Sequence, residues 1–350
     1  MQRTYFLGGA SPQGFETSFW GEQKQYYGFY LKGGPGTGKS TLMKKLAAAF
    51  SGEETALYHC ASDPRSLDAV VFPSRGVFIA DSTAPHEAST PLPFVTGETV
   101  DLAAGLNAAQ LAASAAEIRE LYEANQTAHA QVKKGLAGIA EMEELIAGTG
   151  ESALLRDKLE KYTLRLSKRL FPKKSESAGR LLHRQSMALT PLGRMRFLPE
   201  DYDLILLHDA YAAAGSALLT LLAEAAVRAG LCCEITHSLT QKHRPPVQII
   251  LPEQRLAVIA ASEAKLSELP APVSVLHLQR FYDAEVIRRQ RTLLRFSAKT
   301  AAATEAQVID LLAEALRLHD ELERYYIRAL DTAFLDRQAE LLITKILGRV

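Results

Sequence analysis

The stretch Tyr30–Lys45 (YLKGGPGTGKSTLMKK) contains four glycines just ahead of a lysine, a serine and a threonine. It fits the phosphate-binding pattern G-x-x-x-x-G-K-S/T, with Gly33, Gly38, Lys39 and Ser40 at the fixed positions. The apolar and aromatic run before it predicts a strand, and the helical spacing of apolar residues after it predicts a helix. A strand, a glycine loop and a helix in this order predict a phosphate-binding loop, or P-loop.

Each residue type in this loop has a physical reason to be there. Glycines permit backbone turns that other residues avoid, and they leave no Cβ between the amides and a ligand. Successive N–H groups then form a concave anion site, which the positive end of the following helix strengthens. The expected nucleotide-binding residues are Gly33, Gly34, Pro35, Gly36, Thr37, Gly38, Lys39, Ser40 and Thr41. The alternative is a glycine-rich turn that binds nothing.

Three side chains of the loop have separate expected roles. Lys39 reaches the β- and γ-phosphates, Ser40 offers its hydroxyl to Mg²⁺, and Thr41 is placed to reach the α-phosphate. The base-recognition motif N-K-x-D of GTP-binding proteins is absent from the sequence, so ATP is favoured over GTP.

A further acidic group is expected at the end of a buried strand. In Arg75–His86 (RGVFIADSTAPH) an apolar run ends directly at Asp81. P-loop proteins support Mg²⁺ with a carboxylate in such a place, so Asp81 is expected to join Ser40 in the metal site and Lys39 in catalysis. The alternative is an aspartate that only caps the next segment.

Other polar residues near these motifs are weaker candidates. Asp63 and Asp68 in CASDPRSLDAVV are secondary choices for the acidic role, and His86 is interpreted as a hydrogen-bonded structural residue. Ser82 stands where many P-loop ATPases carry a water-activating glutamate, which predicts slow hydrolysis. Glu87 lies a few residues on and is an alternative activator.

The sequence contains a second copy of the same order of motifs. ASPQGF from Ala10 is echoed by LTPLGR from Leu189, and the stretch from Tyr26 is echoed from Tyr202, at offsets of 176 to 180 residues. We therefore expect an internal duplication with two homologous halves.

The second copy lacks what phosphate binding requires. The residues that replace Gly33, Gly36, Gly38 and Lys39 are Asp209, Ala212, Ala214 and Gly215. An alanine, Ala260 or Ala261, replaces Asp81. The second half is therefore expected to be a scaffold, or a donor of side chains to the first site, and one nucleotide is expected per chain.

Long helical stretches follow both predicted cores. After the first, a helix is expected from Leu102 to about Ala147, a break at Gly148 to Ser152, and then a second helix that ends before Pro172. The expected domains are residues 1–180, with a helical hairpin at about 102–171, and residues 181–350. The predicted fold class is α/β, with two P-loop-like units and largely parallel sheets.

Composition limits the function classes further. Lysine plus arginine equals aspartate plus glutamate at 40 each, which argues against nucleic acid as the main partner. Three cysteines without metal-ligand spacing, no signal-peptide pattern and no long apolar run favour a cytoplasmic protein without a membrane segment.

Taken together, the motifs GGASPQGF, LKGGPGTGKSTLMKK, DPRSLD and DSTAPH resemble those of bacterial tandem P-loop ATPase-like proteins of about this length. The resemblance spans nearly the whole chain. It implies a P-loop fold and ATP binding, with Lys39 and Ser40 in the loop roles and Asp81 in the strand-end role.

The sequence thus predicts a Mg-ATP-binding protein that hydrolyses ATP slowly, coupled to movement of its helices. One alternative is a small-molecule kinase, which a metabolite that strongly stimulates ATP turnover would reveal. Another is a nucleotide-dependent switch that binds a protein partner through the helical hairpins.

Overall fold

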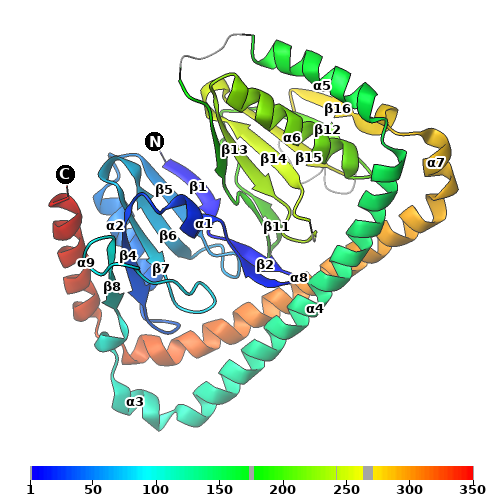
Figure 1. Cartoon of the computed structure of the whole chain (residues 1–350). Helices are drawn as coiled ribbons and strands as arrows, with labels where there is room; N and C mark the ends of the chain where they lie inside the picture. Colours follow the sequence, from blue (N-terminus) through cyan, green and yellow to red (C-terminus); the bar gives the residue numbers. More distant parts are fainter. Residues whose placement is uncertain (1, 173–176, 242, 263–270, 350) are drawn as a thin grey trace. The chain divides into compact units, whose positions relative to one another are not determined.

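The computed structural model describes residues 2–172, 177–241, 243–262 and 271–349, and it forms two compact units (Figure 1). Unit 1 comprises Met1–Lys134, Ser186–Phe197 and Gln307–Val350, and unit 2 comprises Gly135–Gln185 and Leu198–Ala306. Each unit therefore combines segments from both halves of the chain, whereas each of the two large sheets lies in one half.

Unit 1 is built on a six-stranded sheet in the order β1-β5-β6-β7-β4-β8. Its strands are β1 (Gln2–Phe6), β4 (Tyr27–Lys32), β5 (Thr55–His59), β6 (Leu67–Phe72), β7 (Val77–Asp81) and β8 (Gly97–Asp101). Strand β6 runs antiparallel to both neighbours, and the other pairs are parallel. Leu31 of β4 pairs with Asp81 of β7, so the loop after β4 begins at the sheet edge where β7 ends.

Unit 2 repeats this sheet strand for strand, in the order β16-β12-β15-β14-β13-β9. Its strands are β9 (Arg180–His183), β12 (Asp203–His208), β13 (Cys232–His237), β14 (Pro246–Leu251), β15 (Leu256–Ala261) and β16 (Ser274–His277). Strand β14 is antiparallel to both neighbours, as β6 is in unit 1. The predicted α/β architecture with two similar, largely parallel sheets is confirmed.

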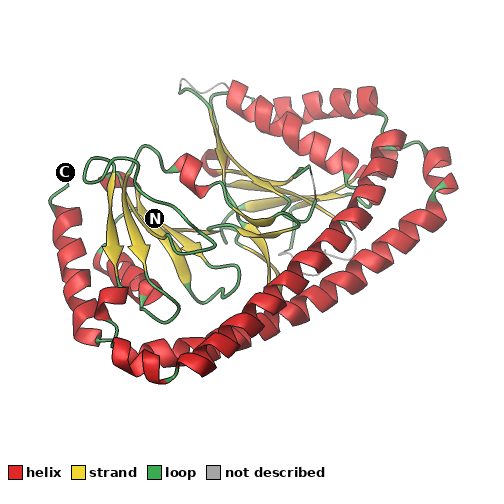
Figure 2. Cartoon of the chain, turned by 60° about the horizontal axis from the view of Figure 1, so that its bottom comes forward, coloured by secondary structure: helices red, strands yellow, loops and turns green. Residues whose placement is uncertain are grey.

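Helices cover these sheets, as Figure 2 shows for each unit. The helices are α1 (Phe19–Glu22), α2 (Lys39–Ala49), α3 (Ala108–Ala113), α4 (Ala115–Ala153), α5 (Arg156–Leu170), α6 (Ala213–Arg228), α7 (Ala284–Arg289), α8 (Arg291–Ala329) and α9 (Thr332–Leu347). Short 3-10 turns occur at η1 (Pro73–Arg75), η2 (Ala103–Gly105), η3 (Pro252–Gln254) and η5 (Leu278–Phe281). Two hairpins, β2–β3 (Gly9–Ser11, Gly14–Glu16) and β10–β11 (Met187–Thr190, Gly193–Arg196), belong to unit 1. None of the helices within the described ranges combines the length and apolar character that crossing a bilayer demands.

Alternation along the strands divides the core of unit 1 into two layers. Phe29 and Leu31 of β4 are fully buried on the face that α2 covers, together with Leu42 and Leu46 of that helix. Tyr30 points to the opposite face and joins a separate aromatic cluster. This alternation fixes β4 in register and so fixes where the glycine loop leaves the sheet.

The last helix of each half completes the core of the unit built on the other half's sheet. Helix α9 packs against α2 in unit 1, where Leu342 is 1% exposed. Helix α5 packs against α6 in unit 2, where the equivalent residue, Leu166, is 4% exposed. The chain thus exchanges helices between its two repeats.

The predicted helix break at Gly148 to Ser152 is wrong, because α4 continues to Ala153. A Cβ on Gly150 would lie 2.4 Å from the carbonyl oxygen of Tyr211. This glycine therefore permits a close backbone approach within unit 2 rather than ending the helix.

Candidate functional site

The loop after β4 has the backbone conformations that its glycines predict. Gly33, Gly36 and Gly38 have φ angles of +157°, +67° and +81°, which side chains with a Cβ rarely adopt. Gly38 is the N-cap of α2, which begins at Lys39. The half-buried Pro35 lies within this turn. The loop and the start of a helix thus occur in the predicted order.

Helix α8 lies directly against this loop. The amide of Gly36 donates to the Glu323 carboxylate over 3.0 Å. A Cβ on Gly36 would lie 2.7 Å from the carbonyl oxygen of Glu323, and one on Gly34 would lie 3.3 Å from the ring of Tyr326. Close packing of α8 is therefore a second physical reason for these two glycines, in addition to room for a ligand.

The ammonium of Lys39 lies among oxygen atoms of the loop and of β7. It donates to the carbonyl oxygens of Gly33 and Gly34 at 2.8 Å each. It is also 3.6 Å from the Asp81 carboxylate, and both side chains are 13% exposed. Packing explains the glycines, but packing alone gives no role to a largely buried cation at this position.

The remaining predicted loop residues differ in their surroundings. Thr37 is buried, and its hydroxyl donates to the carbonyl of Gly34 over 2.9 Å. The Ser40 hydroxyl accepts from the amide of Leu67, at the start of β6, over 3.0 Å. Thr41 is exposed on α2. Ser40 thus faces β6, whereas Thr41 faces outward.

Asp81 combines a turn contact with the lysine contact. One of its carboxylate oxygens accepts from the amide of Thr83 over 2.8 Å. The hydroxyl of Thr83 in turn donates to the carbonyl of Gly33 over 2.9 Å. Asp81 therefore both caps the turn that follows β7 and lies beside Lys39.

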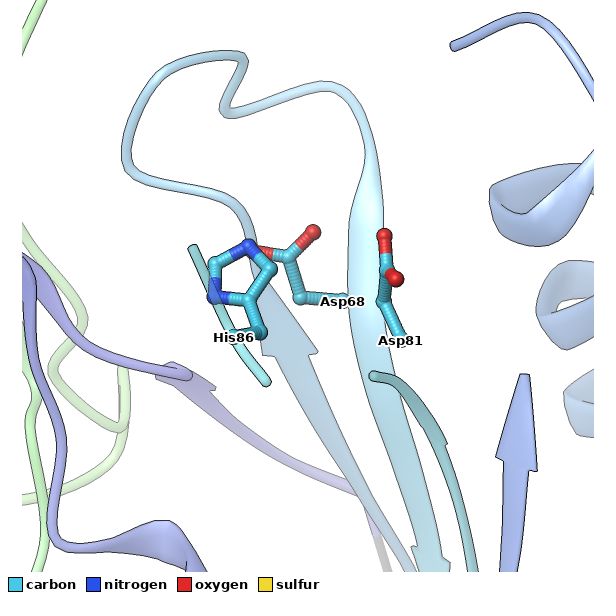
Figure 3. Close-up of side chains that lie close together, drawn as sticks. All are labelled: Asp68, Asp81 and His86. Atoms are coloured by element: carbon cyan, nitrogen blue, oxygen red, sulfur yellow. The ribbon is translucent and has the colours of Figure 1, made fainter. Parts of the chain in front are cut away.

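Asp81 also belongs to a buried cluster with Asp68 and His86 (Figure 3). Their candidate ligand atoms all lie within 4.8 Å of one another, and the three residues are 6–9% exposed. Burial raises the pKa of the Asp68 carboxyl, and the nearby Asp81 raises it further. Asp68 comes from the strand β6, and His86 from the loop that follows β7.

Glu323 is held as an anion against the loop. A hydrogen bond from His319 on the same helix is the main cause that lowers the pKa of this carboxyl. The amide of Gly36 and the ammonium of Lys39 act in the same direction. A carboxylate from α8 thus accepts the hydrogen bond of a loop amide.

In unit 2 two side chains, one next to the equivalent loop and one from beyond η5, accept from the amides of that loop. The Asp209 carboxylate accepts from the amides of Tyr211 and Gly215 over 3.0 and 2.7 Å. The Tyr282 hydroxyl accepts from the amide of Ala214 over 2.7 Å and donates to Asp209. Side chains of unit 2 therefore satisfy the amides that a phosphate would need.

Sequence reasoning ranked Asp68 and His86 below Asp81 and did not identify Glu323. A usable signal for Asp68 is a charged residue inside the apolar strand LDAVVF, since buried charges need partners. Glu323 is 287 residues from Gly36 along the chain, and no local pattern marks it.

Comparison with known proteins identifies no relative of this chain. No protein-family model matches the sequence, and no curated protein or solved structure matches significantly.

Proposed function

We propose that unit 1 binds a nucleoside triphosphate with Mg²⁺ at the loop Gly33–Thr41, with ATP favoured over GTP, and hydrolyses it slowly. The observation that carries this proposal is the position of the Lys39 ammonium, 3.6 Å from the Asp81 carboxylate at the junction of loop and helix. A lysine and a strand-end carboxylate beside the amides of a glycine loop are the groups that phosphoryl transfer requires.

Each group has a defined task in this proposal. Lys39 gives up its contacts with the loop carbonyls and donates to phosphate oxygens, which are stronger acceptors because they are charged. Ser40 and Asp81 offer a hydroxyl and a carboxylate oxygen, the hard ligands that suit Mg²⁺. When bound there, Mg²⁺ neutralises charge on the phosphate oxygens.

The surroundings of Asp81 support slow rather than rapid hydrolysis. Ser82, where many ATPases carry a water-activating glutamate, is fully buried and its hydroxyl donates to the carbonyl of Leu31 over 2.9 Å. It therefore has no access to an attacking water. Glu87 is exposed in the loop beyond.

The contact between α8 and the loop supports coupling to a conformational change. A phosphate that accepts from the amide of Gly36 must replace the Glu323 carboxylate, because both would occupy the same place. Nucleotide binding thus changes the contact between this loop and α8. The readout of that change is a shift in hydrogen exchange along α8.

Calorimetric titration of the full chain with Mg-ATP tests the proposal. We expect one nucleotide per chain and a loss of affinity of about 100-fold or more for Lys39→Ala, because a charged hydrogen-bond donor to phosphate is removed. Lys44→Ala is the matched control, since Lys44 is exposed on the same helix and contacts the carbonyl of Arg65.

Unchanged affinity of a folded Lys39→Ala protein would rule out the P-loop assignment. Folding is checked by circular dichroism. Phosphate release from the wild type then measures turnover, and binding without any release would leave a nucleotide-dependent switch as the better description.

A further inference from the structure

Three buried polar side chains meet beside β7 in unit 1. Asp68 is 6% exposed, Asp81 9% and His86 8%, and their candidate ligand atoms lie within 4.8 Å of one another. Figure 3 shows Asp68 between the other two side chains. Two carboxylates so close together in a buried place repel each other unless one of them holds a proton or a cation lies beside them.

The fold itself does not require these carboxylates. The equivalent sheet of unit 2 has the same strand order, yet Val247 stands in β14 where Asp68 stands in β6. Ala260 likewise stands in β15 where β7 ends in Asp81. A role other than building the sheet must therefore account for the acidic pair.

His86 presents one nitrogen of its buried imidazole to these carboxylates. Its Nε2 atom is 3.4 Å from an Asp68 carboxylate oxygen, and its Nδ1 atom is buried with no hydrogen-bond partner in the part of the chain that the structure describes. Phe15 packs edge-on against the ring, with centroids 4.4 Å apart, and limits its rotation. Nε2, on the side of the ring that faces the carboxylates in Figure 3, is therefore the candidate ligand atom, and Nδ1 lies on the other side of the ring.

We propose that Asp68, Asp81 and His86 bind a divalent first-row transition-metal ion, even without nucleotide. Carboxylates alone suit Mg²⁺ and Ca²⁺, whereas an imidazole in the set favours ions such as Mn²⁺, Fe²⁺, Co²⁺ or Zn²⁺. The charge of the cluster also suits a bound cation, because the Lys39 ammonium beside Asp81 offsets only one of the two carboxylates. Asp81 would then serve two cations, this ion and the Mg²⁺ of the nucleotide.

Titration of the chelator-treated full chain with Mn²⁺, in the absence of nucleotide, tests this site. Loss of the free-ion signal in electron paramagnetic resonance reports binding. We expect one Mn²⁺ per chain and at least a tenfold weaker competition by Mg²⁺, because Mg²⁺ prefers all-oxygen ligands. Each of Asp68→Val and His86→Gln should lower the Mn²⁺ affinity at least tenfold.

The variants separate a metal site from a structural cluster. Asp68→Val introduces the residue found in unit 2, and Asp68→Asn is the isosteric alternative if the valine protein does not fold. Asp101→Asn is the matched control, since Asp101 is exposed at the end of β8, the edge strand of the same sheet. Bound Mn²⁺ should raise the melting temperature of the wild type and of Asp101→Asn only.

Lys39→Ala distinguishes the two proposals. It should lose nucleotide and keep Mn²⁺, because Lys39 is not in the ligand set. The absence of Mn²⁺ binding, or equal affinity in His86→Gln, Asp68→Asn and the wild type, overturns the metal site and leaves the nucleotide site standing. Mn²⁺ binding without any nucleotide binding overturns only the proposed function.

Discussion

The glycine loop of unit 1 and its counterpart in unit 2 solve the same packing problem in opposite ways. In unit 1 the loop has the small residues, and Tyr326 of α8 packs against Gly34 and Gly36. In unit 2 the loop carries Tyr211 and alanines, and the small residue is Gly150 of α4. Gly150 and Tyr326 are equivalent at the offset of 176 residues that relates the starts of α4 and α8. The small residue thus belongs to the loop in one unit and to the helix in the other.

The two loops also differ in which group satisfies their amides. In unit 1 the acceptor is Glu323, which comes from a separate helix and is not part of the loop. In unit 2 it is Asp209, which follows β12 directly and is held by the Tyr282 hydroxyl. On the proposed function, a phosphate replaces the acceptor that comes from another helix, whereas the acceptor next to β12 is lost only by rearranging the loop. On the proposed function, the loop of unit 2 excludes a phosphate through the side chain that fills it as well as through its missing glycines.

The largest expected effect tests the exchange of helices that positions α8 at the loop. Leu342→Ala in α9 and Leu166→Ala in α5 should each lower the free energy of unfolding by about 3 kcal/mol, because each leaves a cavity in a packed core. Hydrogen exchange followed by mass spectrometry should show faster exchange in α2, which lies in the N-terminal half, for Leu342→Ala. For Leu166→Ala the faster exchange should appear in α6. Destabilisation confined to the helix that carries the substitution would contradict the exchange.

The next prediction concerns the filled loop of unit 2. Asp209→Ala should lower the free energy of unfolding by about 2 kcal/mol, because the half-buried amide of Tyr211 and the buried amide of Gly215 lose their acceptor. Urea denaturation, monitored by hydrogen exchange in α6, measures this decrease in the free energy of unfolding. Glu224→Ala, an exposed residue of α6, is the control and should change stability little.

Asp209 also determines how the stability of the folded state should change with pH. Burial raises the pKa of the Asp209 carboxyl above its unfolded value, so the folded state holds this proton more tightly. The contribution of Asp209 to stability is therefore full below the unfolded pKa and declines as the pH rises through the folded pKa. Asp209→Asn should remove this decline, and an identical pH profile in the two proteins would contradict the assignment.

The sequence predicted the framework of both units but only part of the site. Alternating apolar residues and the repeated motifs were enough to place β4, the loop and Asp81, because those signals are local. Glu323 could not be found in this way, since its contact with Gly36 depends on the exchange of α8 and α9 between repeats. Gly150 misled the prediction for a related reason, because a glycine within a helix has the same local signature whether it ends the helix or admits a neighbouring backbone.

A smaller effect is expected from weakening the acceptor in unit 1. Glu323→Gln keeps the shape of the side chain but removes the charge that competes with phosphate at the amide of Gly36. We expect Mg-ATP to bind about fivefold tighter, which corresponds to about 1 kcal/mol, the usual difference between a charged and a neutral acceptor. Glu321→Gln is the control, because Glu321 is a half-buried glutamate of the same helix that pairs with Arg317 and not with the loop. Weaker or unchanged binding in Glu323→Gln would show that this carboxylate does not compete with the nucleotide.

The smallest expected effect is that of restoring the lysine in unit 2. Gly215→Lys should leave the stoichiometry at one nucleotide per chain, although it returns the residue that unit 1 has at the equivalent position. The Asp209 carboxylate still occupies the amides, and a Cβ at Gly215 would lie 3.2 Å from that carboxylate and 2.9 Å from Ala260. The new ammonium would therefore pair with Asp209 rather than await a phosphate. Titration with Mg-ATP decides the matter: two nucleotides per chain in this variant would mean that one lysine outweighs the internal carboxylate, and the contrast between the two loops would then rest on charge alone.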